Sequence, residues 1–527
     1  MSSSGQTDEI SEISDEISEN PKKKHKVETI IDNSNFKYLV NMYYEYYYGK
    51  IPKEDKYHNI PDKIMDLPKQ LRNPNPDPKK NRLPADLQGI PLQDWNINNV
   101  TDMTGLFQRF QFFDEPLDNW ATKLSQVTTM ENMFSNCIWF NQPLNNWDVR
   151  NVQNMERMFL YCKNFNQDLN NWDVSQVEKM DAMFAHCETF NKPLNDWAGK
   201  VSQVKQMGCM FLYCKAFDQP LNNWIVSSVE DMFSMFSGCV EFNQDLNNWG
   251  DNVRNVKIMH GTFYDCVKFN QPLNNWNVSN VEAMESMFSG CRVFNQPLNN
   301  WGNKVSKVTN MEYMFYDCRS FNESLNNWDV SKVTNMDSMF QNCRSFNQSL
   351  NDWDVSKVTN MSSMFKGCRS FNQPLYRWGT KVSQVENMYW IFDGCTSFNQ
   401  PINNWKLNKN VDPDINGMYD DCPISEENKA SPKNYKKWYD LIGKRLFQRI
   451  RERYTAIHAL DYNEQVSEAN KIKLSNKTKL AKTNKLRKMP NPLRKIPNDV
   501  KRNITGYLGG RRTRKSRKSR KSRRNRK

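Results

Sequence analysis

Apolar residues recur along this chain at a period that tryptophan marks most clearly, in steps of 25 or 27 residues between positions 95 and 405. Within one period, residues 152–174, the first apolar positions follow a spacing of three and four residues, which is typical of a helix. These positions are Met155, Met158, Phe159, Cys162 and Phe165. The unit then ends in the pattern L-x-x-W-x-V, whose last apolar positions alternate as in a strand. The pattern therefore predicts one short helical segment and one short strand in each unit.

The apolar positions of successive units form rows of matching residues. Methionine occupies one row from Met103 to Met388, and phenylalanine occupies another from Phe107 to Phe392. A unit of this length is too short to bury a core of its own, so each row must pack against the rows of neighbouring units. The two additional residues of the longer units always follow the tryptophan, which indicates a change confined to a loop. We therefore expect an α/β solenoid of about 12 units of 25 or 27 residues.

The repeated phrase, as it stands in residues 328–350, resembles the repeat of the BspA-like leucine-rich-repeat surface proteins of the DUF285 type. Its pattern is V-x-x-M-x-x-M-F-x-x-C-x-x-F-N-x-x-L-x-x-W, and the likeness covers about residues 95–422. The resemblance implies a leucine-rich-repeat-like solenoid used for adhesion or protein binding, with no catalytic residues to carry over. The first 20 residues differ from bacterial surface proteins, because they hold no apolar segment or lipobox cysteine and so predict no secretory signal.

The pattern divides the chain into five parts. We expect a disordered acidic leader with a basic cluster at 1–34, an N-terminal cap region at 35–94 and the repeat solenoid at 95–422. A basic helical region at 423–510 and a disordered polybasic tail at 511–527 follow. Caps are expected because the end of a solenoid would otherwise expose a sheet edge and apolar side chains. No run of about eighteen apolar residues occurs, so we expect no membrane span.

Cysteine is abundant, with 13 residues, but most of these residues share one position in the repeat. Such repetition indicates a ladder of small buried thiols rather than a disulfide framework. Paired spacings such as C-x-x-C and nearby histidines are lacking, so we expect no metal site and no cofactor. Cys209 stands outside the row, where we expect it to be exposed, and an exposed free thiol suits a reducing compartment.

Polar positions of the repeat divide into a uniform set and a variable set. Asn166 and its equivalents are expected to form an internal ladder, because asparagine side chains bond to turn backbone. Positions that depart from the consensus are better candidates for partner contacts, since exposed tryptophan, tyrosine and arginine dominate interfaces. Single exposed aromatic residues are also common on protein surfaces without a function. The protein-binding candidates are Trp139, Ile225, Tyr376, Arg377 and Trp390.

Charge is distributed unevenly along the chain. Residues 433–527 carry a formal charge of +26, whereas residues 1–432 carry −12. The tail has no aromatic residues, so it predicts non-specific binding to nucleic acid or another polyanion through counterion release, or a targeting role. The candidate polyanion-binding or targeting residues are Lys22, Lys23, Lys24, Lys26, Arg511, Arg512, Arg514, Lys515, Arg517, Lys518, Arg520, Lys521, Arg523, Arg524, Arg526 and Lys527.

Three short motifs lie outside the repeats. Residues 21–27 resemble a monopartite nuclear localisation signal. Residues 435–458 have the apolar spacing of an amphipathic basic helix, which would act as a C-terminal cap or contact a partner. Residues 496–508 resemble the opening helix of an F-box, but the chain runs into the polybasic tail where the rest of that motif should follow.

The five histidines occupy unrelated positions and no glycine-rich phosphate loop occurs, so we expect no enzyme and no small-molecule substrate. We interpret the chain as a non-enzymatic protein-protein interaction repeat protein with a polyanion-binding or nuclear-targeting basic tail. One alternative is a structural virion or nucleic-acid-associated component that is bound through its tail. A second alternative is a ubiquitin-ligase adaptor with a truncated F-box-like motif. The sequence predicts an intracellular location, nuclear or virion-associated.

Removal of residues 511–527 should abolish binding of the chain to a generic polyanion such as heparin. Because the contacts are electrostatic, the affinity of the full chain should fall steeply with salt and should survive scrambling of the tail sequence. Fluorescence anisotropy with labelled heparin at 50 and 200 mM salt measures both effects. Affinity that is lost on scrambling at constant composition would contradict a purely electrostatic contact.

Overall fold

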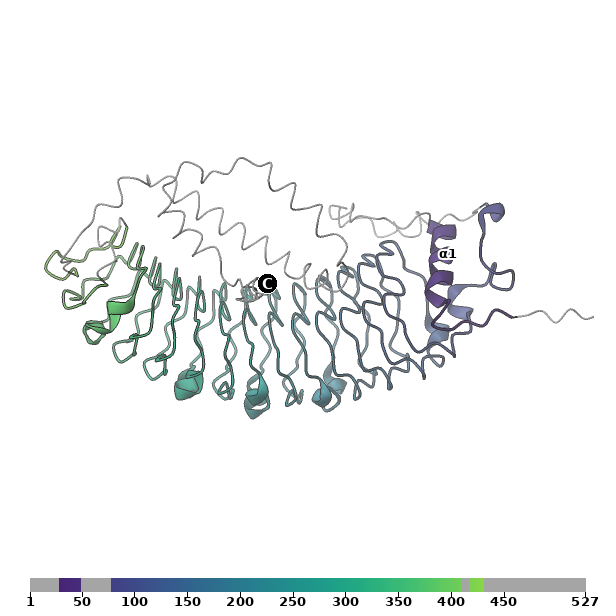
Figure 1. Ribbon diagram of the computed structural model, residues 1–527, viewed down its shortest axis with the longest axis horizontal. Helices are drawn as coiled ribbons and strands as arrows, with labels where there is room; N and C mark the ends of the chain where they lie inside the picture. Colours follow the sequence, from purple (N-terminus) through teal and green to yellow (C-terminus); the bar gives the residue numbers. More distant parts are fainter. Residues whose placement is uncertain (1–27, 49–76, 409–416, 431–527) are drawn as a thin grey trace, which may run out of the picture. The chain divides into compact units, whose positions relative to one another are not determined.

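The computed structural model describes residues 28–48, 77–408 and 417–430 (Figure 1). All of them belong to the first of two compact units of the chain, Met1–Lys436. Within this described part, one α-helix, α1 (Phe36–Tyr48), precedes the repeats. The remaining helices of the described part are short 3-10 helices: η1 (Pro78–Lys80), η2 (Leu92–Asp94), η3 (Asp118–Trp120), η4 (Asn195–Trp197), η5 (Lys200–Gln203), η6 (Asn247–Asn255), η7 (Asn299–Val305), η8 (Tyr376–Trp378) and η9 (Lys381–Gln384).

The repeats form a solenoid in which successive coils stack side by side in sequence order (Figure 1). Single parallel backbone bridges join each coil to the next, at the residue directly before the first methionine of the unit. These bridges connect, in order, Asp102, Thr129, Asn154, Lys179, Gln206, Asp231, Ile258, Ala283, Asn310, Asn335, Asn360 and Asn387. The repeat solenoid is thus confirmed. The prediction of a strand at the tryptophan end of each unit is wrong. In the described coils the parallel backbone bridge lies directly before the first methionine instead.

The methionine-to-cysteine segment, expected to be helical, is a series of tight turns. Arg157 and Tyr161 have left-handed backbone angles, with φ of 56° and 62°. Their amides therefore point to the next coil, where they donate to the carbonyl oxygens of Asp181 and Ala185 at 2.8 Å. The amide of Cys162 instead donates within its own coil to Phe159, at 2.9 Å. The same alternation recurs in the other coils, and we call this segment the turn ladder.

The longer units differ from the shorter ones where the sequence places their insertion. The 3-10 helices η3, η4, η6, η7 and η8 each contain the tryptophan after which the repeat takes 27 residues instead of 25. In η6 and η7 the residue after the tryptophan is a glycine with positive φ, 34° at Gly250 and 25° at Gly302. The insertion is therefore taken up in a local bend, and the bridges on both sides keep their register.

Aromatic and thiol rows form the core. The Phe159 ring stacks on the ring of Phe184 in the next coil, with centroids 5.7 Å apart. The indole N–H of Trp172 donates to the Leu144 carbonyl of the preceding coil at 2.8 Å. The Cys162 thiol donates to the carbonyl of Phe134, also in the preceding coil, at 3.0 Å. The ladder of buried thiols is therefore confirmed, and each thiol in it is a hydrogen-bond donor between coils.

Cys209 is also buried, which corrects the expectation that it is exposed. Only 8% of its surface is accessible, and burial together with Asp181 and Asp231 raises the pKa of its thiol. The sequence position lies on the turn ladder, where a helix would have turned the side chain outward. The backbone at Cys209 is left-handed instead, with φ of 58°, as it is at the equivalent positions of the other coils, so the helix on which the expectation rested is absent.

Helix α1 packs against the first coils of the solenoid (Figure 1). The Tyr44 ring stacks on Phe110 with centroids 3.9 Å apart, and the Tyr43 ring meets Trp95 edge-on at 5.8 Å. The hydroxyl groups of Tyr43 and Tyr48 donate to the buried Glu115 carboxylate at 2.6 and 2.9 Å. These contacts cover apolar rings that would otherwise face water at the first coil.

Replacement of Phe288 by alanine should lower the free energy of unfolding by about 3–5 kcal/mol, the usual loss for a buried phenylalanine. The ring is fully buried and stacks on Phe263 and Phe315, at 5.8 and 5.6 Å, so two neighbouring coils lose contacts at once. Urea denaturation followed by tryptophan fluorescence measures the change. The exposed Val293, changed to alanine in the same region, should alter stability little, and equal losses in the two variants would contradict this core assignment.

Candidate binding surfaces of the solenoid

Many variable side chains of the solenoid lie on the turn ladder, where some are buried and others are half-buried. We define the turn-ladder face as the side chains one, two, five and six residues after the first methionine of each unit. In the unit of Met155 these are Glu156, Arg157, Leu160 and Tyr161. The buried methionine and phenylalanine rows stay almost constant along the stack, whereas this face changes from coil to coil. A surface that varies over a constant frame can be specific for a partner without disturbing the fold.

An aromatic stack lies on the turn-ladder face. The His186 ring lies between Tyr161 and Tyr213, at centroid distances of 4.2 and 5.0 Å and interplanar angles of 10° and 24°. The next coil has Gly238 at the same position, where an added Cβ atom would come within 2.5 Å of the Tyr213 ring. The glycine therefore leaves space for the last ring of the stack. The three rings are half-buried, so each still presents part of its surface.

Half-buried carboxyl groups lie on the same face. Burial, reinforced by Glu156 and Asp231, raises the pKa of Asp181 to about 7. Burial and the neighbouring Asp337 likewise raise the pKa of Glu312 to about 7, although Asn335 donates a hydrogen bond to its carboxylate at 2.9 Å. These acids therefore change charge near neutral pH. Such a surface can donate hydrogen bonds when protonated and attract cationic groups when ionised.

Trp390, a binding candidate from the sequence, lies on the turn-ladder face. Its indole is half-buried, and the Lys366 ammonium lies 5.1 Å from the ring centroid, within the range of a cation–π contact. Lys366 also pairs with Asp393 of the next coil. Gly417 approaches the indole so closely that a Cβ atom there would lie 2.2 Å from the ring. Trp390 is thus held in place near the C-terminal end of the described coils.

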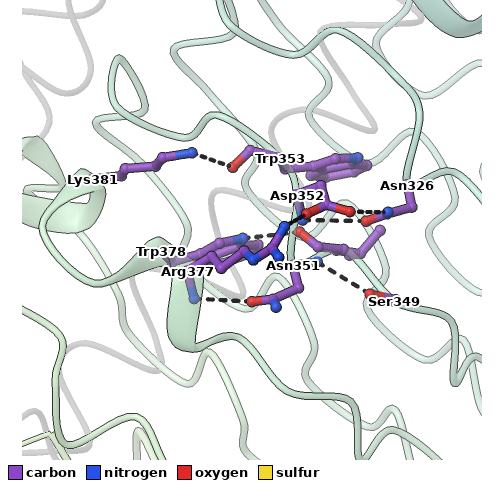
Figure 2. A network of polar contacts seen from close by, with 9 residues as sticks. Asn326, Ser349, Asn351, Asp352, Trp353, Arg377, Trp378 and Lys381 are labelled. Atoms are coloured by element: carbon purple, nitrogen blue, oxygen red, sulfur yellow. Dashed lines mark hydrogen bonds and ion pairs between the residues drawn. The ribbon is translucent and has the colours of Figure 1, made fainter.

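Tyr376 and Arg377 lie on η8, within the Leu-Asn-Asn-Trp segment rather than on the turn ladder. Figure 2 shows the Arg377 guanidinium beside Asp352, with which it forms an ion pair, while Asn326 donates to the other carboxylate oxygen at 2.6 Å. The Asn326 hydrogen bond and the Arg377 charge lower the pKa of Asp352. Tyr376 is half exposed, at 50% of its surface. This polar network fixes the backbone of η8 and leaves the tyrosine ring accessible.

The two remaining candidates of the solenoid behave differently. Ile225 is exposed at 42% of its surface, which agrees with a contact role. Trp139 is buried at 8%, so the expectation that it is exposed is wrong. Its indole N–H is buried and finds no hydrogen-bond partner among the described residues. Six repeat steps separate Ile225 from Tyr376, or roughly 29 Å at the spacing of parallel strands, so the candidates do not form one patch.

The candidate basic residues all lie outside the described residues. This holds for the lysines at 22–26, for the tail at 511–527, and for the helix and F-box-like expectations at 435–458 and 496–508. Their roles stay predictions. Asn166, in contrast, confirms the internal ladder: its amide N–H donates to the Asn141 side chain, and its own side chain accepts from the Asn191 amide, both at 2.9 Å.

The aromatic stack was not predicted from the sequence. A signal was present, since the residue before the ladder cysteine is aromatic or histidine in three consecutive units and glycine or another polar residue in most others. The described residues contain no group of three or more side chains placed to hold a metal ion. Among the helices of that same part, none combines the length and apolar character that crossing a bilayer requires.

Replacement of Glu312 by glutamine should weaken the pH dependence of stability. Glu312 titrates near 7 in the fold and an unfolded glutamate near 4.3, so the folded chain binds the proton more tightly. The stability that the raised pKa of Glu312 contributes is fully present below about pH 4 and is lost as the pH rises through 7. Between pH 5 and 8 the unfolding free energy of the wild type should therefore fall by roughly 1–3 kcal/mol more than that of the variant. Urea denaturation at several pH values measures this difference.

Asp329 provides the control, because a hydrogen bond from Ser331 lowers the pKa of its carboxyl group. A lowered pKa contributes stability that is constant above pH 5, so Asp329→Asn should leave the slope between pH 5 and 8 unchanged. An identical slope for wild type and Glu312→Gln would refute the raised pKa.

The solved structures that resemble the chain at low similarity include two leucine-rich repeat proteins, and no curated protein matches it. A leucine-rich cell surface protein from Faecalibacterium prausnitzii is 14% identical, with a TM-score of 0.27, over 51% of this chain and 81% of that chain. A leucine-rich repeat protein from Eubacterium ventriosum is 11% identical, with a TM-score of 0.26, over 60% of this chain and 83% of that chain.

The expected intracellular location, nuclear or virion-associated, is contradicted by these comparisons. The neighbour from F. prausnitzii is described as a cell surface protein. The expectation rested partly on an exposed Cys209, and that thiol is buried. A buried thiol is shielded from oxidants, so it is no indicator of a reducing compartment.

The family model described as "Mycoplasma protein of unknown function, DUF285" matches the chain five times. The matches cover residues 84–197, 168–264, 197–301, 251–345 and 317–431, which together span more than half of the chain. They coincide with the stacked coils and agree with the BspA-like repeat recognised in the sequence. The chain therefore belongs to the DUF285 family of BspA-like leucine-rich-repeat proteins.

Proposed function

We propose that the solenoid is a non-enzymatic binding module and that a protein partner contacts its turn-ladder face. The observation that carries this proposal is the contrast between the constant buried rows and the variable, aromatic turn-ladder face. A protein that served only as a scaffold would need the constant buried rows but not the variable face. Aromatic rings that are retained half-exposed, with a glycine making space for them at position 238, are suited to contact another molecule.

The composition of the face supports a protein partner. The stack of Tyr161, His186 and Tyr213 offers rigid rings with polar edges, and tyrosine and tryptophan are enriched in the residues that dominate binding energy. Asp181 and Glu312 add groups that donate or accept hydrogen bonds near neutral pH. Trp390 supplies a further aromatic contact toward the other end of the same face. The partner would therefore present polar and cationic groups beside apolar ones.

Tyr376, Arg377 and Ile225 remain secondary candidates in this proposal. Tyr376 and Ile225 are exposed apolar side chains outside the turn ladder, at 50% and 42%. Arg377 is already engaged by Asp352, so its contribution would be to orient η8 rather than to supply a free charge. A partner that wraps around the edge of the coils would reach both η8 and the turn ladder.

Replacement of Tyr213 by alanine should weaken partner binding by roughly tenfold to thirtyfold, the loss expected for an aromatic hot spot. Ligands for the measurement can be obtained by selecting displayed peptides against the immobilised full-length chain. Biolayer interferometry then compares the affinities of the variants for each selected peptide. Tyr213 lies at the end of its stack next to Gly238, so its truncation removes contact surface without opening the core.

Tyr38→Ala is the matched control, because Tyr38 is an exposed tyrosine of α1, outside the repeats, with 63% of its surface accessible. This variant should retain full affinity, and Tyr376→Ala tests the secondary site. Selected ligands that tolerate every turn-ladder substitution, and lose binding only when residues 511–527 are removed, would show that the repeats act as a scaffold for the tail.

A further inference from the structure

A row of arginines lies directly after the ladder cysteine in four successive coils. Its members are Arg292, Arg319, Arg344 and Arg369. The same position holds Val267 in the coil before and Thr396 in the coil after, so the row ends on both sides. All members are exposed except Arg319, which is half-buried. We call this set the arginine row, and it lies outside the turn-ladder face proposed above for partner binding.

Backbone hydrogen bonds hold the arginine row at a regular spacing. In each step of the row, the residue after the arginine donates its amide to the carbonyl of the arginine in the preceding coil. These donors are Ser320, Ser345 and Ser370, at 3.1, 3.2 and 3.2 Å. The buried phenylalanine two residues after each arginine stacks on its equivalent in the next coil, with ring centroids 6.0 Å apart at all three steps. The arginine backbone therefore repeats at a similar step.

Asp317 holds the two arginines at one end of the row. Its carboxylate accepts from Nε of Arg292 at 3.2 Å and from Nε and Nη2 of Arg319 at 2.9 and 3.0 Å. A guanidinium has five N–H donors, so both arginines keep donors for another anion. Within the described residues, these are the ion pairs of the row, and Arg344 and Arg369 take part in none.

The positive charge of these four coils is not balanced locally. From two residues before each ladder cysteine to six residues after it, the coils carry five basic side chains, the fifth being Lys366. The acids of the same segments are Asp317 and Glu323. Lys366 pairs with Asp393 of the next coil, so the charge that stays uncompensated is that of the arginines.

Earlier coils show how the same position stabilises the stack when its charges alternate. There Lys163, Glu188 and Lys215 form ion pairs from coil to coil, at 3.1 and 2.6 Å. In the arginine row the neighbouring charges are alike, and like charges facing each other on neighbouring strands are destabilising. The row therefore lowers the stability of the free chain, and an anion bound along it would remove the repulsion.

We propose that the arginine row binds an extended acidic segment of a protein partner, with carboxylates at every second residue. Alternate side chains of a strand lie on one face and repeat about every 6.6 Å. The stacked rings beside the row repeat at 6.0 Å, so over three steps the two spacings differ by about 2 Å, which long arginine side chains can absorb. A guanidinium also matches a carboxylate through two parallel hydrogen bonds.

The surroundings of the row favour a peptide strand over other anionic partners. The phenylalanine rings directly beside the row are buried, so they cannot stack on the bases of a single-stranded nucleic acid. An amphipathic helix would need an apolar groove, whereas the residue after the arginine is serine in three of the four coils and Val293 in the other. An anionic membrane would need a broad basic surface, and the arginine row is a single line of side chains.

The test uses two photoreactive peptides of the same composition and the full-length chain. In the first peptide four glutamates alternate with serines. In the second the four glutamates are consecutive, so an extended strand presents only two of them on one face. Mass spectrometry of the crosslinks measures labelling of residues 289–374 separately from labelling of the polybasic tail. The alternating peptide should label these coils at a concentration roughly threefold or more below that of the consecutive one.

Arg344→Gln combined with Arg369→Gln should raise the concentration of alternating peptide needed for labelling by about tenfold, because two ion pairs are lost. The matched control is Lys332→Gln with Lys357→Gln, which removes the same charge from exposed positions of the same two coils. This control should be labelled like the wild type. Because the arginine variant also loses repulsion along the row, its unfolding free energy in urea should equal or exceed that of the wild type.

Labelling confined to residues 431–527, equal labelling of the row by both peptides, or an equal loss in the lysine control would overturn the inference. A clear fall in the unfolding free energy of the arginine variant would show that the row serves the stack rather than a partner. A sulfated oligosaccharide that protects the row at lower concentration than the alternating peptide does would contradict a peptide as the partner.

Discussion

The stack depends on two carbonyl groups in each coil that accept two hydrogen bonds at once. The carbonyl of Leu144 accepts the amide of Trp147 from its own coil and the indole N–H of Trp172 from the next, at 3.0 and 2.8 Å. The carbonyl of Phe134 likewise accepts the Cys137 amide and the Cys162 thiol, at 2.9 and 3.0 Å. Each coil therefore closes its own turn and binds its neighbour through the same atoms. A shift of one coil against the next would break both sets of bonds, which explains why an insertion is accepted only after the tryptophan.

The apolar rows predicted the solenoid and its core because only stacking can bury them. They did not predict the backbone within a unit, since a spacing of three and four residues arises equally from a helix and from consecutive turns. One left-handed position did leave a trace, because the residue before the ladder cysteine is often Gly238, Asp265, Gly290 or an equivalent that tolerates positive φ. The other left-handed position is glycine only in Gly105 and Gly261 and holds residues such as Arg157, Cys209 and Trp390 in other coils. The sequence signal there is therefore weaker, and bonds between coils impose the conformation.

The surface was harder to predict than the core. Trp139 was a candidate as an isolated departure from the consensus, but a large side chain at a variable position can also be buried, as this one is. The stack of Tyr161, His186 and Tyr213 was missed because none of its members is unusual alone, and their meaning depends on coils lying one above another. In a solenoid, therefore, the informative unit for function is a run along one row across several repeats.

The burial of the thiol ladder determines how the chain reacts with oxidants and with disulfide-exchange partners. Burial raises the pKa of thiols such as Cys239 and Cys291 well above its ordinary value, so almost none of the reactive thiolate is present. Each sulfur is also engaged by a carbonyl, as Cys291 is by Phe263 at 3.0 Å. While the coils stay closed, oxidants and disulfide-exchange partners therefore cannot reach the sulfur atoms, and the thiols hardly ionise to the reactive thiolate. A column of free cysteines can in this way persist in oxidising surroundings, and its vulnerability is set by how often a coil opens rather than by the redox potential outside.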